Sequence, residues 1–123
     1  MTIPAPDFRC ELRRDHGLTA VVVEGELEEI SAVQLAAACL HAGDTTGNGE
    51  IAGDVILDLG GISFADGTGI RMVETIHRAF DRSGHRLTVV GPPRRVKAEI
   101  DRLGLDGVLR LESEMPVPAA LTG

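Results

Sequence analysis

The turn Asp66-Gly67-Thr68-Gly69 holds the residue types most suited to a specific contact in this chain. An Asp at the start of a helix accepts hydrogen bonds from backbone amides, so we expect Asp66 to cap the helix that follows. The two glycines permit a tight turn with positive φ, and Thr68 supplies the only hydroxyl of the turn. We therefore expect this turn to open a helix. Any contact with a partner comes in addition to that structural role.

The other residues with chemical potential form no obvious site. Asp54 and Asp58 are four apart in one predicted strand, which places both side chains on one face, but no third group completes an acid–base site. The histidines are spread over predicted turns and helices, so solvated or interfacial positions fit them better than metal ligation or base catalysis. The four are His16, His41, His77 and His85. We expect no catalytic residue, no bound metal and no cofactor.

The cysteines, the basic cluster and the glycine-rich stretch have simple interpretations. Cys10 and Cys39 lie in no CxxC or Cys/His cluster, so we expect two small buried apolar residues. The run Arg94-Arg95-Val96-Lys97 is interpreted as a solvated first helical turn. Residues 43–53 are rich in glycine and polar side chains, which predicts a mobile surface loop. No Lys-Ser/Thr pair follows, so a phosphate-binding loop is not indicated.

Composition narrows the classes of partner. The chain has 123 residues and a formal net charge of −7, which repels nucleic-acid backbones and anionic membranes. Aromatic residues are 2% of the chain, whereas single-stranded nucleic acids are bound by stacking bases on aromatic rings. No stretch approaches the ~20 apolar residues of a membrane span, and the N-terminus lacks a signal-peptide pattern. We expect a cytoplasmic protein that binds neither nucleic acid nor membrane.

The hydrophobic pattern predicts an N-terminal hairpin and a first helix. Residues 8–13 alternate as a half-buried strand does, and residues 18–24 form a β-branched strand buried on both faces. Asp15-His16-Gly17 joins the two as a turn. Ser31 is the expected cap of a helix that ends near residues 41–43. Its apolar side is supplied by Val33, Leu35, Ala36, Ala37 and Leu40.

Two strand–helix units and a final short strand follow. Residues 60–65 carry a buried strand at 54–59 to a turn, and Asp66-Gly67-Thr68-Gly69 opens a helix that stops at Gly84. The apolar spacing on that helix is Ile70, Val73, Ile76, His77 and Phe80. A strand at 87–90, a helix after Pro92 and Pro93 that ends at Gly104, and a short strand at 108–111 complete the chain.

The order β-β-α-β-α-β-α-β predicts an α/β fold with a mixed, largely parallel sheet, an N-terminal hairpin and helices packed on the sheet. We expect one domain over residues 1–123, with loose tails at 1–6 and 116–123. The pattern leaves open whether the chain forms a homodimer.

A set of motifs runs through residues 54–111. It comprises a hydrophobic strand ending Asp58-Leu59, the segment Ile62-Ser63-Phe64, an Asp-x-[Ser/Thr]-Gly turn before a helix, and Gly84 before the strand LTVVG. Upstream, residues 25–28 read GELE, close to a Gly-[Glu/Asp]-[Leu/Ile]-Asp motif. In this combination the chain resembles a STAS domain, the fold of bacterial anti-sigma factor antagonists. The resemblance spans nearly the whole chain.

The resemblance implies a protein-binding function and no enzymatic activity. In that family the antagonist docks on an anti-sigma factor, often a serine kinase, and thereby frees a sigma factor. The kinase phosphorylates a Ser in an Asp-Ser-[Ser/Thr]-Gly loop, and the phosphorylated antagonist dissociates. A phosphoryl group adds roughly −1.5 to −2 charge at neutral pH and repels a partner at a carboxylate-bearing surface.

This chain departs from the family pattern at the decisive residue, because Gly67 occupies the position of the phosphorylated Ser. Either Thr68, at the second hydroxyl position, accepts the phosphate, or the domain binds its partner without this switch; we favour the second alternative. The expected partner-binding residues lie in the turn, on the adjoining helix and before the first helix. They are Asp66, Gly67, Thr68, Gly69, Arg71, Glu26 and Glu28.

Two other functions remain open from the sequence. One is a STAS domain that senses a small ligand or acts as a scaffold, without a phosphoswitch. The other is a receiver-type phosphoacceptor domain, which has a similar size and element order. A receiver needs an acidic pair after its first strand and a late Lys, whereas here LTVVG is followed by Pro-Pro.

Overall fold

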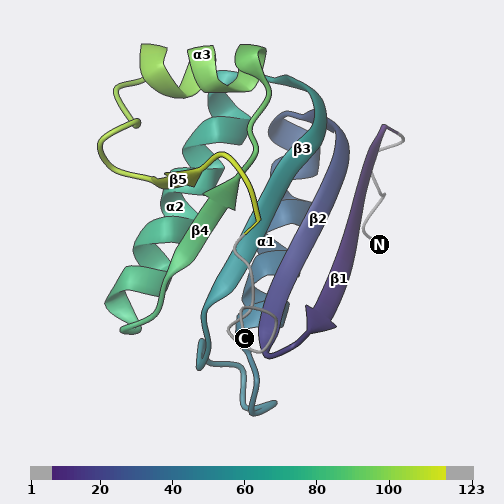
Figure 1. Ribbon diagram of the computed structural model, residues 1–123, viewed down its shortest axis with the longest axis vertical. Helices are drawn as coiled ribbons and strands as arrows, with labels where there is room; N and C mark the ends of the chain where they lie inside the picture. The colour runs from purple at the N-terminus through teal and green to yellow at the C-terminus, as the bar shows by residue number, and fades with distance from the viewer. Residues whose placement is uncertain (1–6, 116–123) are drawn as a thin grey trace.

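Residues 7–115 are described in the computed structural model, and their elements follow the predicted order (Figure 1). None of the helices in these residues has the length and apolar character needed to span a bilayer. The elements are β1 (Phe8–Asp15), β2 (Leu18–Leu27), α1 (Glu29–Gly43), β3 (Val55–Ala65), α2 (Gly67–Arg82), β4 (Leu87–Val90), α3 (Arg94–Arg102) and β5 (Arg110–Glu112).

The five strands form one sheet in the order β1-β2-β3-β4-β5. β1 and β2 pair antiparallel, and every later neighbour pairs parallel, which confirms the predicted mixed, largely parallel sheet. Asp15 and Leu18 close the hairpin with two residues between them, His16 at φ 49° and Gly17 at φ 81°. Two consecutive positive φ values give the type I′ turn whose twist matches that of a hairpin.

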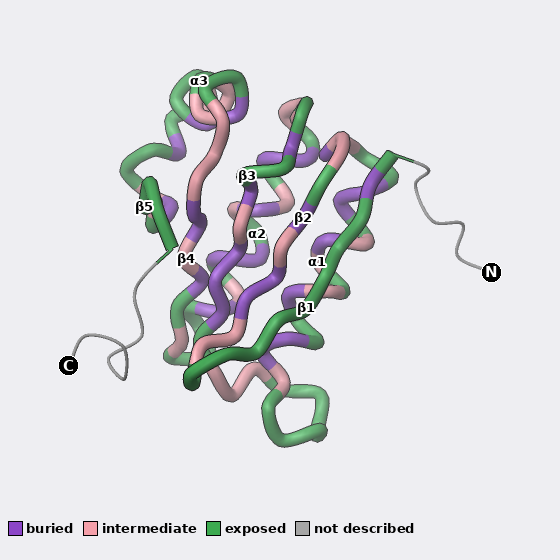
Figure 2. Tube along the Cα trace, turned by 45° about the vertical axis from the view of Figure 1, so that its right-hand side comes forward, coloured by how far each residue is buried: buried purple, intermediate pink, exposed green. Residues whose placement is uncertain are grey.

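The main core lies between the sheet and the helices, with α1 and α2 behind the strands in Figure 1. On α2 the predicted apolar spacing is confirmed, because all five residues are buried, His77 included. A smaller cluster of Ala20, Ile56 and Val90 is also buried. Figure 2 shows that burial concentrates in the inner strands, while β1 and β5 at the two edges are mostly exposed.

β1 corrects two predictions. Its expected half-buried alternation is wrong, because only Phe8 is buried and the seven residues after it are exposed. Cys10 is therefore exposed, whereas Cys39 on α1 is buried as predicted. Burial raises the pKa of the Cys39 thiol to about 12. The alternation failed because β1 lies at the edge of the sheet, where Phe8 is its only residue in the core cluster.

α1 corrects two more predictions. The helix begins at Glu29 with Glu28 as its cap, so Ser31 lies inside the first turn and is fully buried. Val33 and Leu40 were expected on the apolar side but are 60% and 43% exposed. The side that faces the core consists instead of Ser31, Ala32, Leu35, Cys39 and Ala42. Because α1 is apolar around most of its circumference, the period alone selects no face.

β3 extends to Ala65, beyond the predicted strand at 54–59, so residues 60–65 belong to the strand that they were expected to carry to a turn. Two register shifts along β2 accommodate this extension. A Cβ on Gly61 would lie 2.9 Å from the Val23 carbonyl oxygen, so the strands approach too closely for any other residue. Asp54 precedes the strand and accepts a hydrogen bond from the Arg86 amide at 2.9 Å. The Asp58 carboxylate accepts from the Gly60 amide instead, so the two aspartates do not act as a pair.

Candidate functional site

The turn before α2 is held by its first residue, as predicted. Asp66 has extended backbone, with φ −97° and ψ 178°, and its Oδ1 accepts a hydrogen bond from the Gly69 amide at 2.8 Å. The Asp66 amide in turn donates to the Leu27 carbonyl at 3.1 Å. One residue thus caps the helix and ties it to the end of β2.

Gly69 is required by a close approach and not by a positive φ. It is buried, and a Cβ added there would lie 2.5 Å from the Leu27 carbonyl oxygen and 2.7 Å from Leu27 Cγ. Backbone atoms of this kind cannot move aside without shifting β2 or α2. The contact brings the turn against the chain that leads into α1, where Glu26 and Glu28 lie.

The segment from Glu26 to Ser31 is ordered by a buried hydroxyl. Ser31 Oγ accepts from the Glu28 amide at 2.7 Å and donates to the Glu26 carbonyl at 2.7 Å. Both glutamates are half-buried. The structure therefore brings together two groups of predicted residues that are 38 positions or more apart in sequence, through Leu27 between them.

Gly67 is the first residue of α2 and has room for a side chain. A Cβ there would meet only Arg102 Nη2 and Glu99 Oε1 on α3, both at 3.8 Å, and its φ is not in the left-handed region. Arg102 and Glu99 form an ion pair, with Arg102 Nε 3.0 Å from Glu99 Oε2. This hydrogen bond lowers the pKa of Glu99. The fold would accept a serine at position 67.

Thr68 and Arg71 present their side chains to solvent. Thr68 is exposed. Arg71, one helical turn further on, donates from Nη1 to Glu74 Oε1 at 3.1 Å. Hydrogen bonds from Arg78 first, and from Arg71, lower the pKa of Glu74. Both predicted residues are thus accessible from solvent.

Sequence reasoning missed two exposed apolar side chains beside this turn. Phe64 is 48% exposed, lies two residues before Asp66 and pairs with Glu26 across β3 and β2. Ile30, in the first turn of α1, is 61% exposed. Both appear in the sequence as ordinary core candidates. The signal available for Phe64 was its place beyond the predicted buried strand at 54–59 and next to the turn.

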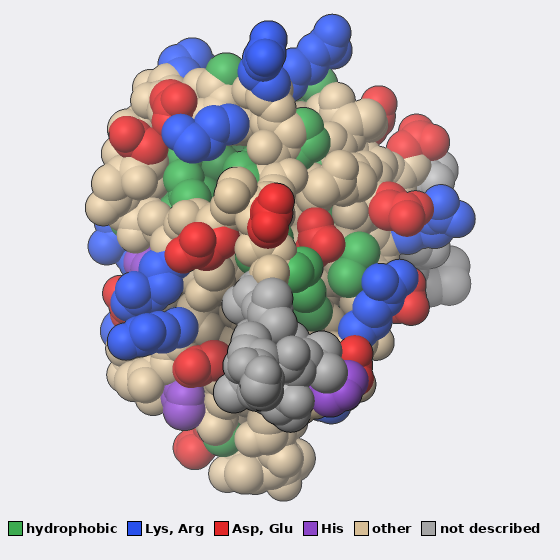
Figure 3. Space-filling model, in the orientation of Figure 1, with side chains coloured by type: hydrophobic (Ala, Val, Ile, Leu, Met, Phe, Trp, Pro, Cys, Tyr) green, Lys and Arg blue, Asp and Glu red, His purple; other side chains and the backbone are tan. Residues whose placement is uncertain are grey.

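Basic side chains gather over α3, next to the turn. In Figure 3 Lys and Arg side chains lie at the top of the molecule, where α3 runs. Arg94 and Arg95 are exposed there, as predicted for a solvated first turn. No three His, Cys, Asp or Glu side chains within residues 7–115 gather as metal ligands do.

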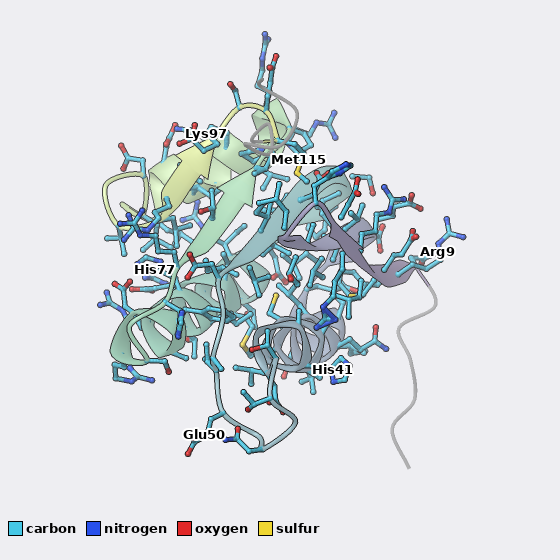
Figure 4. The ribbon with its side chains drawn as sticks, turned by 60° about the horizontal axis from the view of Figure 1, so that its bottom comes forward. Arg9, His41, Glu50, His77, Lys97 and Met115 are labelled. Atoms are coloured by element: carbon cyan, nitrogen blue, oxygen red, sulfur yellow. The ribbon has the colours of Figure 1, made fainter. Side chains whose placement is uncertain are left out.

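The burial of His77 contradicts its expected solvated or interfacial position, although it confirms the apolar spacing in which the sequence also placed this residue. It lies on α2 (Figure 4), is 5% exposed, and its Nδ1 has no hydrogen-bond partner within residues 7–115. Its Nε2 is 3.5 Å from Asp81 Oδ2. It belongs to the helix face that packs on the core and not to the turn.

Similar solved structures share this fold. The anti-sigma factor antagonist SpoIIAA in its unphosphorylated form is 18% identical with a TM-score of 0.68, over 92% of this chain and 93% of that one. An anti-sigma factor antagonist from Mycobacterium paratuberculosis is 21% identical with a TM-score of 0.72, over 98% and 97%. The murine anion transporter Solute Carrier 26 family member A9 is 18% identical with a TM-score of 0.68, over 89% of this chain but 18% of the transporter.

No curated protein sequence matches the chain. The STAS domain family matches residues 9–116, which include every strand and helix except the first residue of β1. This chain belongs to the STAS domain family.

Proposed function

We propose that the protein is a non-enzymatic antagonist that docks on a kinase-type anti-sigma factor and so regulates release of a sigma factor. The observation that carries the proposal is the contact of Asp66 and Gly69 with Leu27, which joins the two predicted partner-binding segments into one surface. We call it the turn surface and define it as Glu26, Glu28, Ile30, Phe64, Thr68 and Arg71. Solved antagonists of the same fold support this assignment.

The turn surface has the composition of a protein-binding site. Phe64 and Ile30 expose apolar area, and exposed apolar groups rimmed by charged ones mark interaction surfaces. Aromatic residues and Arg carry much of the binding energy at protein interfaces. Phe64 and Arg71 are therefore the expected anchors, and the glutamates form a polar rim.

We infer that binding proceeds without the serine phosphoswitch. Gly67 has no hydroxyl, and the space around it shows that the fold does not demand glycine there. The alternative is that the kinase phosphorylates Thr68 instead. We rank this alternative second, because a kinase positioned for one residue need not reach its neighbour. Mass spectrometry after incubation with the kinase and ATP, with Thr68→Ala as the control, decides between the two.

The binding proposal is tested by calorimetric titration against the kinase-type anti-sigma factors encoded in the same genome. We expect one of them to bind, and Phe64→Ala to weaken that complex by about tenfold or more. Glu112→Ala, on the far edge strand β5, is the matched control and leaves the affinity unchanged. Binding to none of the anti-sigma factors would refute the proposal.

A second candidate function is ligand sensing at the opposite end of the sheet. A groove of about 560 Å³ there is lined by polar side chains and by the apolar Leu18, Val55 and Ile56. They include Thr19, Thr45, Asp54, His85, Arg86 and Thr88. His85 Nδ1 is 3.3 Å from Asp54 Oδ1. A small ligand that co-purifies and is retained in native mass spectrometry would favour this function, and an empty protein would count against it.

A further inference from the structure

The outer edge of β1 presents backbone amides and carbonyls that could pair with another strand. Within residues 7–115, β1 pairs only with β2 and forms one edge of the sheet (Figure 1). The strand is eight residues long and contains no proline. Edges of this length attract pairing with another strand unless something prevents it.

The hairpin fixes which backbone groups face outward. The Glu26 amide donates to the Asp7 carbonyl at 2.7 Å, and Asp7 and Glu26 continue the register that pairs Arg9 with Glu24. The amide and carbonyl of one strand residue point to the same side, and those of the next point to the opposite side. Odd-numbered residues of β1 therefore bond to β2. Even-numbered residues present their amides and carbonyls at the outer edge, centred on Cys10, Leu12 and Arg14.

The side chains on one face of β1 alternate in charge. Arg9, Glu11, Arg13 and Asp15 all face the side of the sheet opposite the helices, because they are paired with Glu24, Val22, Ala20 and Leu18. The sequence of charges is plus, minus, plus, minus. When a second copy of the strand is placed antiparallel and centred on Leu12, each positive charge of one copy lies opposite a negative charge of the other.

We propose that this edge binds β1 of a second copy, antiparallel, with a two-fold axis through Leu12. The two Leu12 residues then form a hydrogen-bonded pair, and so do Cys10 and Arg14 of opposite copies. Arg9 meets Asp15 of the second copy, and Glu11 meets Arg13. These charged pairs fall in the non-hydrogen-bonded positions, where opposing side chains are closest. The result is one continuous sheet through both copies.

Charges within one copy already satisfy part of this series. Arg13 Nη2 lies 3.0 Å from Glu11 Oε2, and Arg9 Nη2 lies 2.7 Å from Glu24 Oε2. Figure 4 shows Arg9 projecting from the outside of the molecule on β1. When two copies pair, these exposed ion pairs within each copy are replaced by exposed ion pairs between the copies. The net gain therefore comes from the backbone ladder and from Leu12, which is 38% exposed.

The same charges select the pairing. The same strand in parallel, or shifted by two residues, places like charges opposite one another, which is destabilising. A dimer formed only by two strands buries less surface than a standard interface of ~1,200–2,000 Å². We therefore expect a weak, reversible dimer.

Sedimentation equilibrium across a wide range of protein concentration tests the proposal through charge exchange. Glu11→Arg and Arg13→Glu each place like charges opposite one another twice, and each raises the dissociation constant by about tenfold or more. The double variant Glu11→Arg/Arg13→Glu restores complementarity and dimerises within about threefold of the unchanged protein. An equimolar mixture of the two single variants forms the heterodimer.

Circular dichroism of each variant, compared with the parent spectrum, verifies that the monomer fold is kept. Glu112→Arg on the opposite edge, β5, is the matched control and leaves the dimer unchanged. A parent chain that stays monomeric at every concentration overturns the proposal, and so do single variants that dimerise as the parent does. Neither result bears on binding to an anti-sigma factor, which uses the turn surface.

Discussion

The starts of α1 and α2 are joined through Leu27 but are built from different parts. α1 is ordered by the buried Ser31 hydroxyl. α2 is ordered by the Asp66 carboxylate and by Gly69, which lies against Leu27. Thr68, between these anchors, is exposed and makes no comparable close approach. The residues that hold the turn are thus not the residue it exposes, and under the proposed function this difference predicts separate effects on stability and on binding.

The largest expected effect is at Gly69. Gly69→Ala forces a Cβ to within 2.5 Å of the Leu27 carbonyl oxygen, and we expect a loss of about 3 kcal/mol or more in the free energy of unfolding in urea. Gly67→Ala, two residues earlier, is the matched control and changes stability by less than about 1 kcal/mol. Equal losses of unfolding free energy at both positions would contradict the specific role of the close approach at Gly69.

The buried hydroxyl at the start of α1 comes next. Ser31→Ala leaves the Glu28 amide and the Glu26 carbonyl without their partner, at a cost of about 2 kcal/mol. Thr75→Ala on α2 removes an exposed hydroxyl bonded to the Arg71 carbonyl and costs less than about 0.5 kcal/mol. Thermal and urea unfolding measure both. A Ser31→Ala variant as stable as the Thr75→Ala control would show that α1 does not depend on this hydroxyl.

The cap of α2 is expected to contribute less than the buried serine of α1. Asp66→Ala removes the acceptor for the Gly69 amide and lowers the free energy of unfolding by about 1 kcal/mol. Asp66→Asn keeps an acceptor oxygen and stays close to the parent in the same unfolding experiment. If Asn were as damaging as Ala, the charge and not the cap would be what matters.

The smallest effect concerns pH. Because Arg78 and Arg71 lower the pKa of Glu74 below its usual value of 4.5, the ionised form is favoured in the folded state. Its contribution to stability is present above the unfolded pKa and is lost as pH falls through the lowered folded value. Glu74→Gln should therefore reduce stability near neutral pH and match the parent in acid, below the lowered folded pKa of Glu74. A difference that persists in acid would assign the effect to packing.

The element order, the hairpin, the largely parallel sheet and the apolar face of α2 were all predicted from the sequence, because each rests on a strong pattern. The face of α1 was not, since Val33 and Leu40 look identical to core residues in an apolar helix. β1 was predicted with the wrong burial because the pattern does not reveal which strand lies at an edge. The role of Gly69 depended on Leu27, 42 residues earlier in the chain, and no local signal connects the two.

The central claim is that the turn surface contacts the anti-sigma factor. Amide hydrogen exchange of the free protein and of its complex tests it most directly, because it reports on every segment at once. The account predicts added protection in residues 26–31 and 64–75, with little change in β1, β5 and the loop at 44–53. Protection confined to the loop at 44–53 and the groove beside His85, with none at the turn, would contradict it.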